Sequence, residues 1–229
     1  MDSDRGFGES EFATLSPEEQ RRGARLRNEA DRVAFTVTRA ALRAILSETT
    51  GVAASDLEFR PNAWGKLSLA DEAFAEIDFS VSHTRSLSVI ALSHGCSVGV
   101  DVEASRACPD RHRIAADVFG ADAARRLNDA ENADLLFLEM WTAAEAFLKA
   151  QGTGFGGATG TVPIFLSGSR DQPRIQLDER RSATTGWKLS RLSLPAGFVG
   201  HVVCGKTPAQ KHLLNLRDDI QASVVYALT

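Results

Sequence analysis

Few cysteines and no long apolar run are present in this sequence, and both shortages narrow the class of protein. Cys96, Cys108 and Cys204 are an odd number, widely spaced and without a CxxC pair. We therefore expect no disulfide framework and a reducing, cytoplasmic environment. No apolar run approaches the roughly 20 residues that cross a bilayer, and residues 1–11 lack the apolar segment of a secretory signal. We expect no membrane association.

Two further classes of function are disfavoured. The histidines show no H-E-x-x-H or other zinc spacing, which argues against a zinc hydrolase. With 26 basic against 30 acidic residues, the net charge is −4. This balance argues against a general nucleic-acid binder, although a local basic patch could still bind a phosphate.

The chain has enough apolar residues, 43% of 229, for one large or two small domains with a buried core. Residues 1–14 read as a frayed lead-in. A helix is then expected to begin at Ser16, because Ser16 and Glu19 have the spacing of a capping box around Pro17. A longer amphipathic helix is expected over residues 30–46, where apolar residues recur every four positions. Its apolar positions are Val33, Val37, Ala41 and Ile45, and the interleaved Arg32, Arg39 and Arg43 are expected on a solvated face.

The middle of the chain reads as three short strands, over residues 77–82, 86–93 and 97–103, rich in β-branched residues and separated by turn formers. In the third strand, valines at positions 98, 100 and 102 alternate with Gly99, Asp101 and Glu103. The valines are therefore expected to face a core. The two carboxylates then point to the opposite face, roughly 7 Å apart.

The second half of the chain begins with helical sequence over residues 113–127 and a longer helix over residues 133–150. Leu136, Met140 and Phe147 form the apolar stripe of the longer helix, and Gly152 is expected to end it. Strands of a second sheet are expected over residues 161–166, 174–177, 186–194 and 198–204. The fold class is therefore α+β, with two α+β halves packed together, residues 1–108 and 109–229.

Three sets of polar residues could carry chemistry. Asp101 and Glu103 repel each other unless a cation lies between them, and Mg²⁺ prefers such oxygen ligands; a solvated strand edge is the plainer interpretation. Glu145 and Lys149 lie four residues apart on one helix face, either as an ordinary ion pair or as a third carboxylate with a lysine beside phosphates. Ser82 and His83 end a strand, with no G-x-S-x-G elbow around Ser82 to make it a nucleophile.

Taken in order, these segments resemble those of 4′-phosphopantetheinyl transferases of the Sfp type, which are monomeric pseudo-dimers. The resembling segments are Trp64-Gly65-Lys66 and residues 79–83, 98–103 and 141–152. The resemblance implies two similar α+β halves with coenzyme A between them. It also implies Mg²⁺-dependent transfer of phosphopantetheine from coenzyme A to a serine of a carrier protein, in a polyketide or non-ribosomal peptide pathway. Mn²⁺ stays open as the metal, and we expect a monomer.

The resemblance also implies residue roles. Asp101, Glu103 and Glu145 would be the metal ligands, and Glu145 would help to deprotonate the serine. Lys149 would offset charge on the pyrophosphate and the leaving group. Ser82 and His83 would contact the phosphates of coenzyme A, and Lys66 the region of the 3′-phosphate.

Three departures leave a second interpretation open. Ala34 stands where the family has an arginine that helps to hold the 3′-phosphate, Ala144 replaces the lysine before the helix glutamate, and Ala123 replaces a glutamate. A chain lacking these charges could have lost the reaction. It would then act as an accessory protein that binds a carrier protein or acyl-coenzyme A, or carry out different chemistry at the same site.

Overall fold

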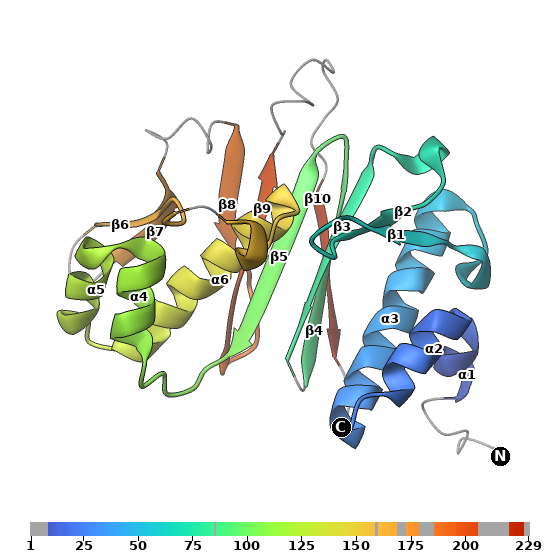
Figure 1. Cartoon of the computed structure of the whole chain (residues 1–229), viewed down its shortest axis with the longest axis horizontal. Coiled ribbons are helices and arrows are strands. Elements are labelled where there is room, and N and C mark those ends of the chain that lie inside the picture. The colour runs from blue at the N-terminus through green and yellow to red at the C-terminus, as the bar shows by residue number, and fades with distance from the viewer. Residues whose placement is uncertain are drawn as a thin grey trace.

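The computed structural model describes residues 9–84, 86–158, 160–168, 173–178, 186–205 and 220–226. Helices and strands are mixed along the chain, which confirms the α+β class (Figure 1). The helices are α1 (Glu9–Thr14), α2 (Pro17–Ala24), α3 (Glu29–Thr50), α4 (Arg111–Phe119), α5 (Ala121–Asn128) and α6 (Ala133–Gln151). The strands are β1 (Phe59–Pro61), β2 (Leu67–Leu69), β3 (Ile77–His83), β4 (Leu87–His94), β5 (Ser97–Ala104), β6 (Ile164–Gly168), β7 (Pro173–Leu177), β8 (Trp187–Arg191), β9 (Phe198–Gly205) and β10 (Ile220–Tyr226).

The start of the chain is more ordered than its sequence indicates. Residues 9–14 form α1, so the expected lead-in is wrong for them, and residues 1–8 lie outside the described part. The capping box of α2 is confirmed, because Glu19 Oε2 accepts from the Ser16 amide at 2.9 Å and Ser16 Oγ accepts from the Glu19 amide at 3.3 Å. These bonds satisfy two amides that the helix leaves unpaired.

Helix α3 is confirmed, but its buried face differs from the expected stripe. Of the four apolar positions named above, only Val37 is buried, and the largest apolar side chains buried on this helix are Phe35, Leu42 and Leu46. Arg43 is 1% exposed, so its expected place on a solvated face is wrong. Its guanidinium is satisfied internally, by Glu19 Oε2 at 2.7 Å and by the carbonyls of Ala54 and Leu57.

The strands form two antiparallel three-stranded sheets, ordered β10-β4-β3 and β5-β9-β8, and two short hairpins, β1-β2 and β6-β7. The three strands of the middle region are confirmed. The expected second sheet is partly wrong, because among the described strands β6 and β7 pair with each other alone, while β8 and β9 join β5. Strand β10, which the sequence analysis did not anticipate, pairs with β4.

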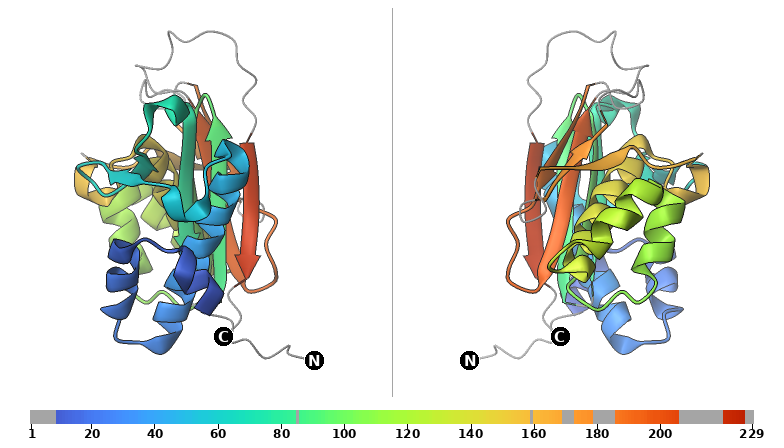
Figure 2. Two further views of the ribbon diagram at one scale, coloured as in Figure 1. Left: turned by 90° about the vertical axis from the view of Figure 1, so that its right-hand side faces the viewer. Right: turned by 90° about the vertical axis from the view of Figure 1, so that its left-hand side faces the viewer.

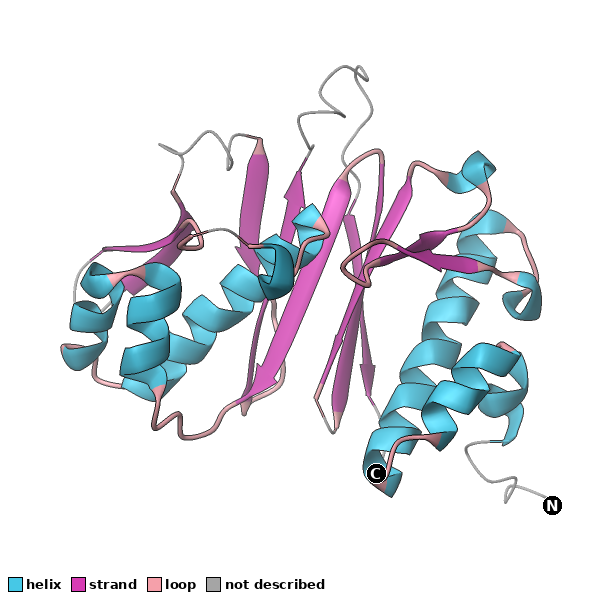
Figure 3. Ribbon diagram, in the orientation of Figure 1, coloured by secondary structure: helices cyan, strands magenta, loops and turns pink. Residues whose placement is uncertain are grey.

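The two sheets lie side by side at the centre of the molecule, with α1–α3 on one flank and α4–α6 on the other (Figures 1 and 3). The side views show the helices gathered toward one side of the strands (Figure 2). The expected single helix over residues 113–127 is two helices, because Gly120 adopts φ 92° between α4 and α5. The proposed division of the chain at residue 108 stays a prediction.

Helix α6 packs directly on β5 at a glycine. A Cβ at Gly99 would lie 2.0 Å from the Ala146 carbonyl oxygen and 2.3 Å from the Ala150 amide nitrogen. Only glycine therefore allows this close approach, which brings the two elements with the candidate carboxylates together. The helix ends as expected, with Gly152 in a left-handed conformation at φ 75°.

Two expectations from the sequence are tested only within the described residues. No helix described there is both long and apolar enough to cross a membrane. Cys96, Cys108 and Cys204 are buried thiols.

Candidate active site

Strand β5 presents its carboxylates beneath α6. Val98, Val100 and Val102 are buried in the core on one face, as the alternation predicts. Asp101 points the other way but is only 6% exposed, because α6 covers that face. Glu103, two residues on, is partly exposed and lies 3.3 Å from Arg106 Nη2. A plain solvated strand edge is therefore wrong for Asp101.

The two oxygens of Asp101 have different surroundings. Oδ1 accepts from Ser82 Oγ at 2.7 Å and from Lys149 Nζ at 2.7 Å. Oδ2 is buried and has no hydrogen-bond partner in the described part of the chain. An ionised oxygen without a partner in a buried position is costly, so this atom is suited to a cation.

Glu145 faces the same region from α6. Burial raises the pKa of Glu145, Lys149 opposes that shift, and the nearby charges of Asp101 and Glu103 add to it. The three predicted ligands therefore share one electrostatic environment. Lys149, one turn further along α6, also donates to the Val100 carbonyl at 3.2 Å, which ties the helix to β5.

The donor set fits a hard divalent cation in its chemistry. Carboxylate oxygens are the ligands that Mg²⁺ prefers, and Asp101 Oδ2 supplies one ligand without a competing hydrogen bond. Within the described ranges, however, no three His, Cys, Asp or Glu side chains are close enough to form a closed metal cluster. The structure thus shows suitable ligands around Asp101 rather than a preformed coordination shell.

A pocket of about 330 Å³ is lined by Glu145 and Lys149, and Asp101 lies next to it through its contact with Lys149. Glu103 lines a separate pocket, of about 210 Å³, with Arg106 and Trp141. Cationic side chains from four elements or loops line the first pocket together with Glu145: Arg22, Arg39, Lys66 and Lys149. Such a wall is suited to a ligand with several phosphates. Lys66 is already engaged, because its Nζ donates to Asp78 Oδ2 at 2.6 Å and to the Val98 carbonyl at 3.1 Å.

Arg39 is a pocket residue that the sequence analysis missed. Its Nε lies 3.3 Å from Glu19 Oε1, and its guanidinium lies over the rings of Phe35 and Phe59. Its Nη1 is buried without a hydrogen-bond partner, and burial is the main cause of its lowered pKa. Helical periodicity alone placed this arginine on a solvated face, and no local signal distinguishes it from Arg32, which instead donates to the Leu26 carbonyl.

The loop before Lys66 closes one end of the pocket. Asn62 Oδ1 accepts from the amides of Trp64 and Lys66, and Asn62 Nδ2 donates to the Gly152 carbonyl at 2.7 Å. The loop is thereby fixed to the C-terminus of α6. The indole of Trp64 is 56% exposed and lies against Gly157, where a Cβ would come within 2.9 Å of it.

The other two predicted phosphate contacts, Ser82 and His83, differ in burial. Ser82 is buried beside Asp101, whereas His83 is exposed at the end of β3. The three departures, Ala34, Ala123 and Ala144, are all buried in the hydrophobic core. They are therefore packing positions in this chain, and none of the three lines the pocket.

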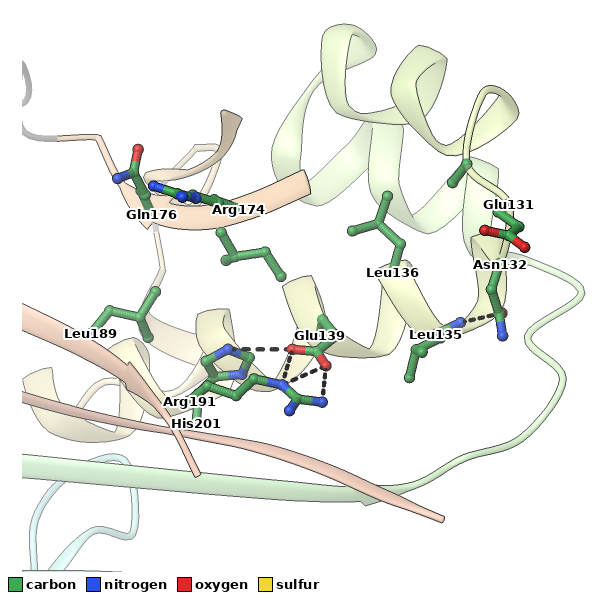
Figure 4. Close-up of a pocket in the computed structure, with 12 residues that line it drawn as sticks. Glu131, Asn132, Leu135, Leu136, Glu139, Arg174, Gln176, Leu189, Arg191 and His201 are labelled. Carbon is green, nitrogen blue, oxygen red and sulfur yellow. Dashed lines mark hydrogen bonds and ion pairs between the residues drawn. The ribbon is translucent and has the colours of Figure 1, made fainter. Parts of the chain in front are cut away.

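A second pocket, of about 570 Å³, lies beside the other end of α6 (Figure 4). There Arg191 donates to both oxygens of Glu139, and His201 Nδ1 lies 2.8 Å from Thr142 Oγ1. His201 Nε2 lies 3.5 Å from Glu139 Oε2. This pocket is larger than the first, but its Glu139 is held by Arg191 through both oxygens, whereas Asp101, beside the first pocket, keeps one oxygen without a partner among the described residues. The pocket lined by Glu145 and Lys149 is therefore the better candidate for an anionic substrate with a metal.

Two glycine patterns with the spacing of phosphate-binding loops belong to other elements. Gly152, Gly154 and Gly157 follow the end of α6 rather than joining a strand to a helix. The run from Gly200 to Lys206 has Walker A spacing, but residues 200–205 lie within β9 and pair with β5. Neither pattern has the strand–loop–helix setting of a Rossmann or Walker A site.

Comparisons with known proteins agree with the family that the sequence resembles. Residues 97–203 match the 4′-phosphopantetheinyl transferase superfamily. The chain is 31% identical over 187 residues to a putative 4′-phosphopantetheinyl transferase of Synechocystis, covering 80% of this chain and 74% of that protein. It is 35% identical over 147 residues to the 4′-phosphopantetheinyl transferase HetI of Nostoc, covering 62% of this chain and 61% of that one.

Among solved structures, the holo-[acyl-carrier-protein] synthase of Thermotoga maritima matches 48% of this chain and 62% of that chain, with a TM-score of 0.36 and 20% identity. The Synechocystis relative is the more informative match, because its identity extends across most of both chains. The chain therefore belongs to the 4′-phosphopantetheinyl transferase superfamily, whose enzymes transfer phosphopantetheine from coenzyme A to carrier proteins.

Proposed function

We propose that this transferase holds Mg²⁺ and the pyrophosphate of coenzyme A at Asp101, Glu103 and Glu145, and transfers phosphopantetheine to a serine of a carrier protein. The observation that carries the proposal is Asp101, a buried carboxylate with one oxygen held by two donors and the other without a partner. Mn²⁺, with the same preference for oxygen ligands, is the alternative metal.

The chemistry is a displacement at the β-phosphorus of coenzyme A. The serine oxygen forms a bond to this phosphorus as the bond to the bridging oxygen breaks, and adenosine 3′,5′-bisphosphate leaves. When bound, Mg²⁺ would neutralise charge on the pyrophosphate. Lys149 lies beside Asp101 and would offset charge on the departing phosphate.

Glu145 is suited to accept the proton of the serine hydroxyl. Its carboxyl lines the pocket beside Lys149, burial raises its pKa, and a carboxylate is a common general base. A water could relay this proton between the two groups.

The rest of the donor extends along the cationic wall of the pocket. With the pyrophosphate at Asp101, we place the 3′-phosphate at Arg39 and Arg22, because Arg39 Nη1 has no hydrogen-bond partner among the residues that the structure describes. Lys66 lines the same wall and would contact the region of the 3′-phosphate; it is paired with Asp78, as Lys149 is with Asp101. His83, exposed at the end of β3, would contact phosphate from the rim.

Several finer features are part of the same proposal. The carrier protein would belong to a polyketide or non-ribosomal peptide pathway of secondary metabolism. The enzyme would act in the cytoplasm as a monomer of two halves, residues 1–108 and 109–229, and would bind neither nucleic acid nor membranes.

The alternative, suggested by the three alanines, is that the chain has lost the reaction and acts as an accessory protein or carries out different chemistry. The test must distinguish this alternative from an active transferase. Ala34, Ala123 and Ala144 fill the core, and none of them lines the pocket. The Asp101 site is retained with its lysine. These two observations favour an active transferase.

Intact-protein mass spectrometry on a panel of apo carrier proteins tests the proposal. Each carrier is incubated with the enzyme, coenzyme A and Mg²⁺, and a gain of one phosphopantetheine arm is expected on at least one of them. The gain should disappear with chelator and fall at least a hundredfold in the variants D101N and E145Q. Binding of coenzyme A without any gain in mass, by a folded preparation, would favour the accessory role instead.

A further inference from the structure

Strand β5 is held on its second edge by side chains rather than by another strand. Its first edge pairs with β9. On the other side, three side chains of β3 accept hydrogen bonds from alternate amides of β5. They are Asp78 Oδ2 from Val98 at 2.7 Å, Ser80 Oγ from Val100 at 3.1 Å and Ser82 Oγ from Val102 at 3.2 Å. We call these three residues the side-chain ladder; it joins the two sheets.

Ser82 differs from the other members because its hydroxyl also donates. A serine hydroxyl has one proton, and that of Ser82 goes to Asp101 Oδ1 at 2.7 Å. The residue is only 6% exposed. It therefore has no second proton to offer a phosphate of coenzyme A, which is the role that the family resemblance implies for it.

The hydrogen bond from Ser82 helps to fix the orientation of the Asp101 carboxylate. Ser82 and Lys149 approach the same oxygen, Oδ1, from two different elements, β3 and α6. Two donors on one oxygen fix the plane of the carboxylate and leave Oδ2 without a partner. A ligand held in one orientation before the metal arrives loses less entropy on binding.

We propose that Ser82 is a positioning residue for the metal site: it acts through Asp101, and its substitution weakens metal binding rather than binding of coenzyme A. The proposal rests on the proposed function, because it assumes that Asp101 ligates the metal. In this proposal the side-chain ladder does more than join the two sheets, because Ser82 also connects the edge of β5 to the predicted metal ligand Asp101.

Electron paramagnetic resonance of Mn²⁺, titrated into the protein with saturating coenzyme A, measures metal affinity without turnover. S82A should raise the dissociation constant for Mn²⁺ about tenfold, the effect of losing one hydrogen bond to a charged group. The KM for coenzyme A should change less than twofold. S80A is the matched control for the metal titration, because it also removes one acceptor from a β5 amide but no contact with Asp101; with coenzyme A saturating, it should leave Mn²⁺ affinity unchanged. Ser80 lines the pocket, so S80A is not used as the control for the KM for coenzyme A.

Thermal unfolding shows whether each variant is folded. If S82A does not fold, S82C, which is nearly isosteric and has a weaker donor, should show a smaller loss of Mn²⁺ affinity in the same direction. If S82A has unchanged Mn²⁺ affinity and a raised KM for coenzyme A, the inference is overturned. Ser82 would then contact a phosphate of coenzyme A, as the family resemblance implies. If the folded wild type binds no Mn²⁺ beyond coenzyme A alone, the metal site of the proposed function is wrong, and this inference fails with it.

Discussion

At the scale of single residues, the pocket contains one arginine whose role the sequence does not reveal. Arg39 has a guanidinium nitrogen without a hydrogen-bond partner among the described residues, and it lies in the wall of the pocket that Glu145 and Lys149 also line. Arg32 and Arg43, on the same helix, have their donors engaged by carbonyls or by Glu19. The position of an arginine on α3 predicts its exposure poorly, because the groups that bind its guanidinium come from α2 and from loops.

The placement of the 3′-phosphate at Arg39 gives a kinetic prediction. In R39Q, the KM for coenzyme A should rise about tenfold, because a charge-assisted hydrogen bond to phosphate is lost. The KM for dephospho-coenzyme A, which lacks that phosphate, should change little. R32Q is the control, since Arg32 is bonded to Leu26 away from the pocket. An equal rise for both donors would show that Arg39 does not recognise the 3′-phosphate.

His201 gives a prediction about acid stability. Burial lowers the pKa of His201 to about 4 from an ordinary 6.5. The unfolded chain therefore binds a proton more tightly than the folded chain, and stability falls as the pH drops from about 6.5 to 4. The loss attributable to this residue is about 3 kcal/mol.

Urea unfolding of the wild type and of H201Q at pH 7 and pH 4 measures that loss. The wild type should lose about 3 kcal/mol more than H201Q over this range, since glutamine does not titrate. Equal losses in the two proteins would mean that His201 is already protonated in the fold or does not differ from the unfolded chain.

At the scale of helices and strands, much of the structure follows from local pattern. The capping box at Ser16 and Glu19, the valine alternation in β5 and the glycine that ends α6 all predict what is found. Pairing does not follow from local pattern. The sequence could not show that β5 joins β9, or that β3 side chains reach β5 amides, because these partners lie far apart in the chain.

The close contact of α6 with β5 leaves no room for a side chain at position 99. G99A should destabilise the protein by about 3 kcal/mol or more, because its methyl group would overlap the backbone of α6. G51A is the control: Gly51 has φ 75° but nothing within 4 Å of a Cβ. It should cost only about 1 kcal/mol, from backbone strain. Similar shifts in the denaturation midpoints of both variants would contradict this close packing.

At the scale of the whole molecule, the candidate site depends on both flanks. The loop with Trp64 and Lys66 comes from the N-terminal side, and α6 with Glu145 and Lys149 from the C-terminal side. Strand pairing crosses between these regions as well, through β5 with β9 and β4 with β10 (Figure 3). The sequence identified the carboxylates by their resemblance to a family, but the pocket walls required the assembled fold.

The central claim is that the pocket at Asp101 holds the donor with its metal. A crystal structure with coenzyme A and Mn²⁺, using anomalous scattering to locate the metal, tests it most directly. We expect the Mn²⁺ peak at Asp101 Oδ2, the pyrophosphate beside Lys149 and the 3′-phosphate at Arg39. Coenzyme A bound instead in the pocket of Glu139, Arg191 and His201, with no metal at Asp101, would contradict the account.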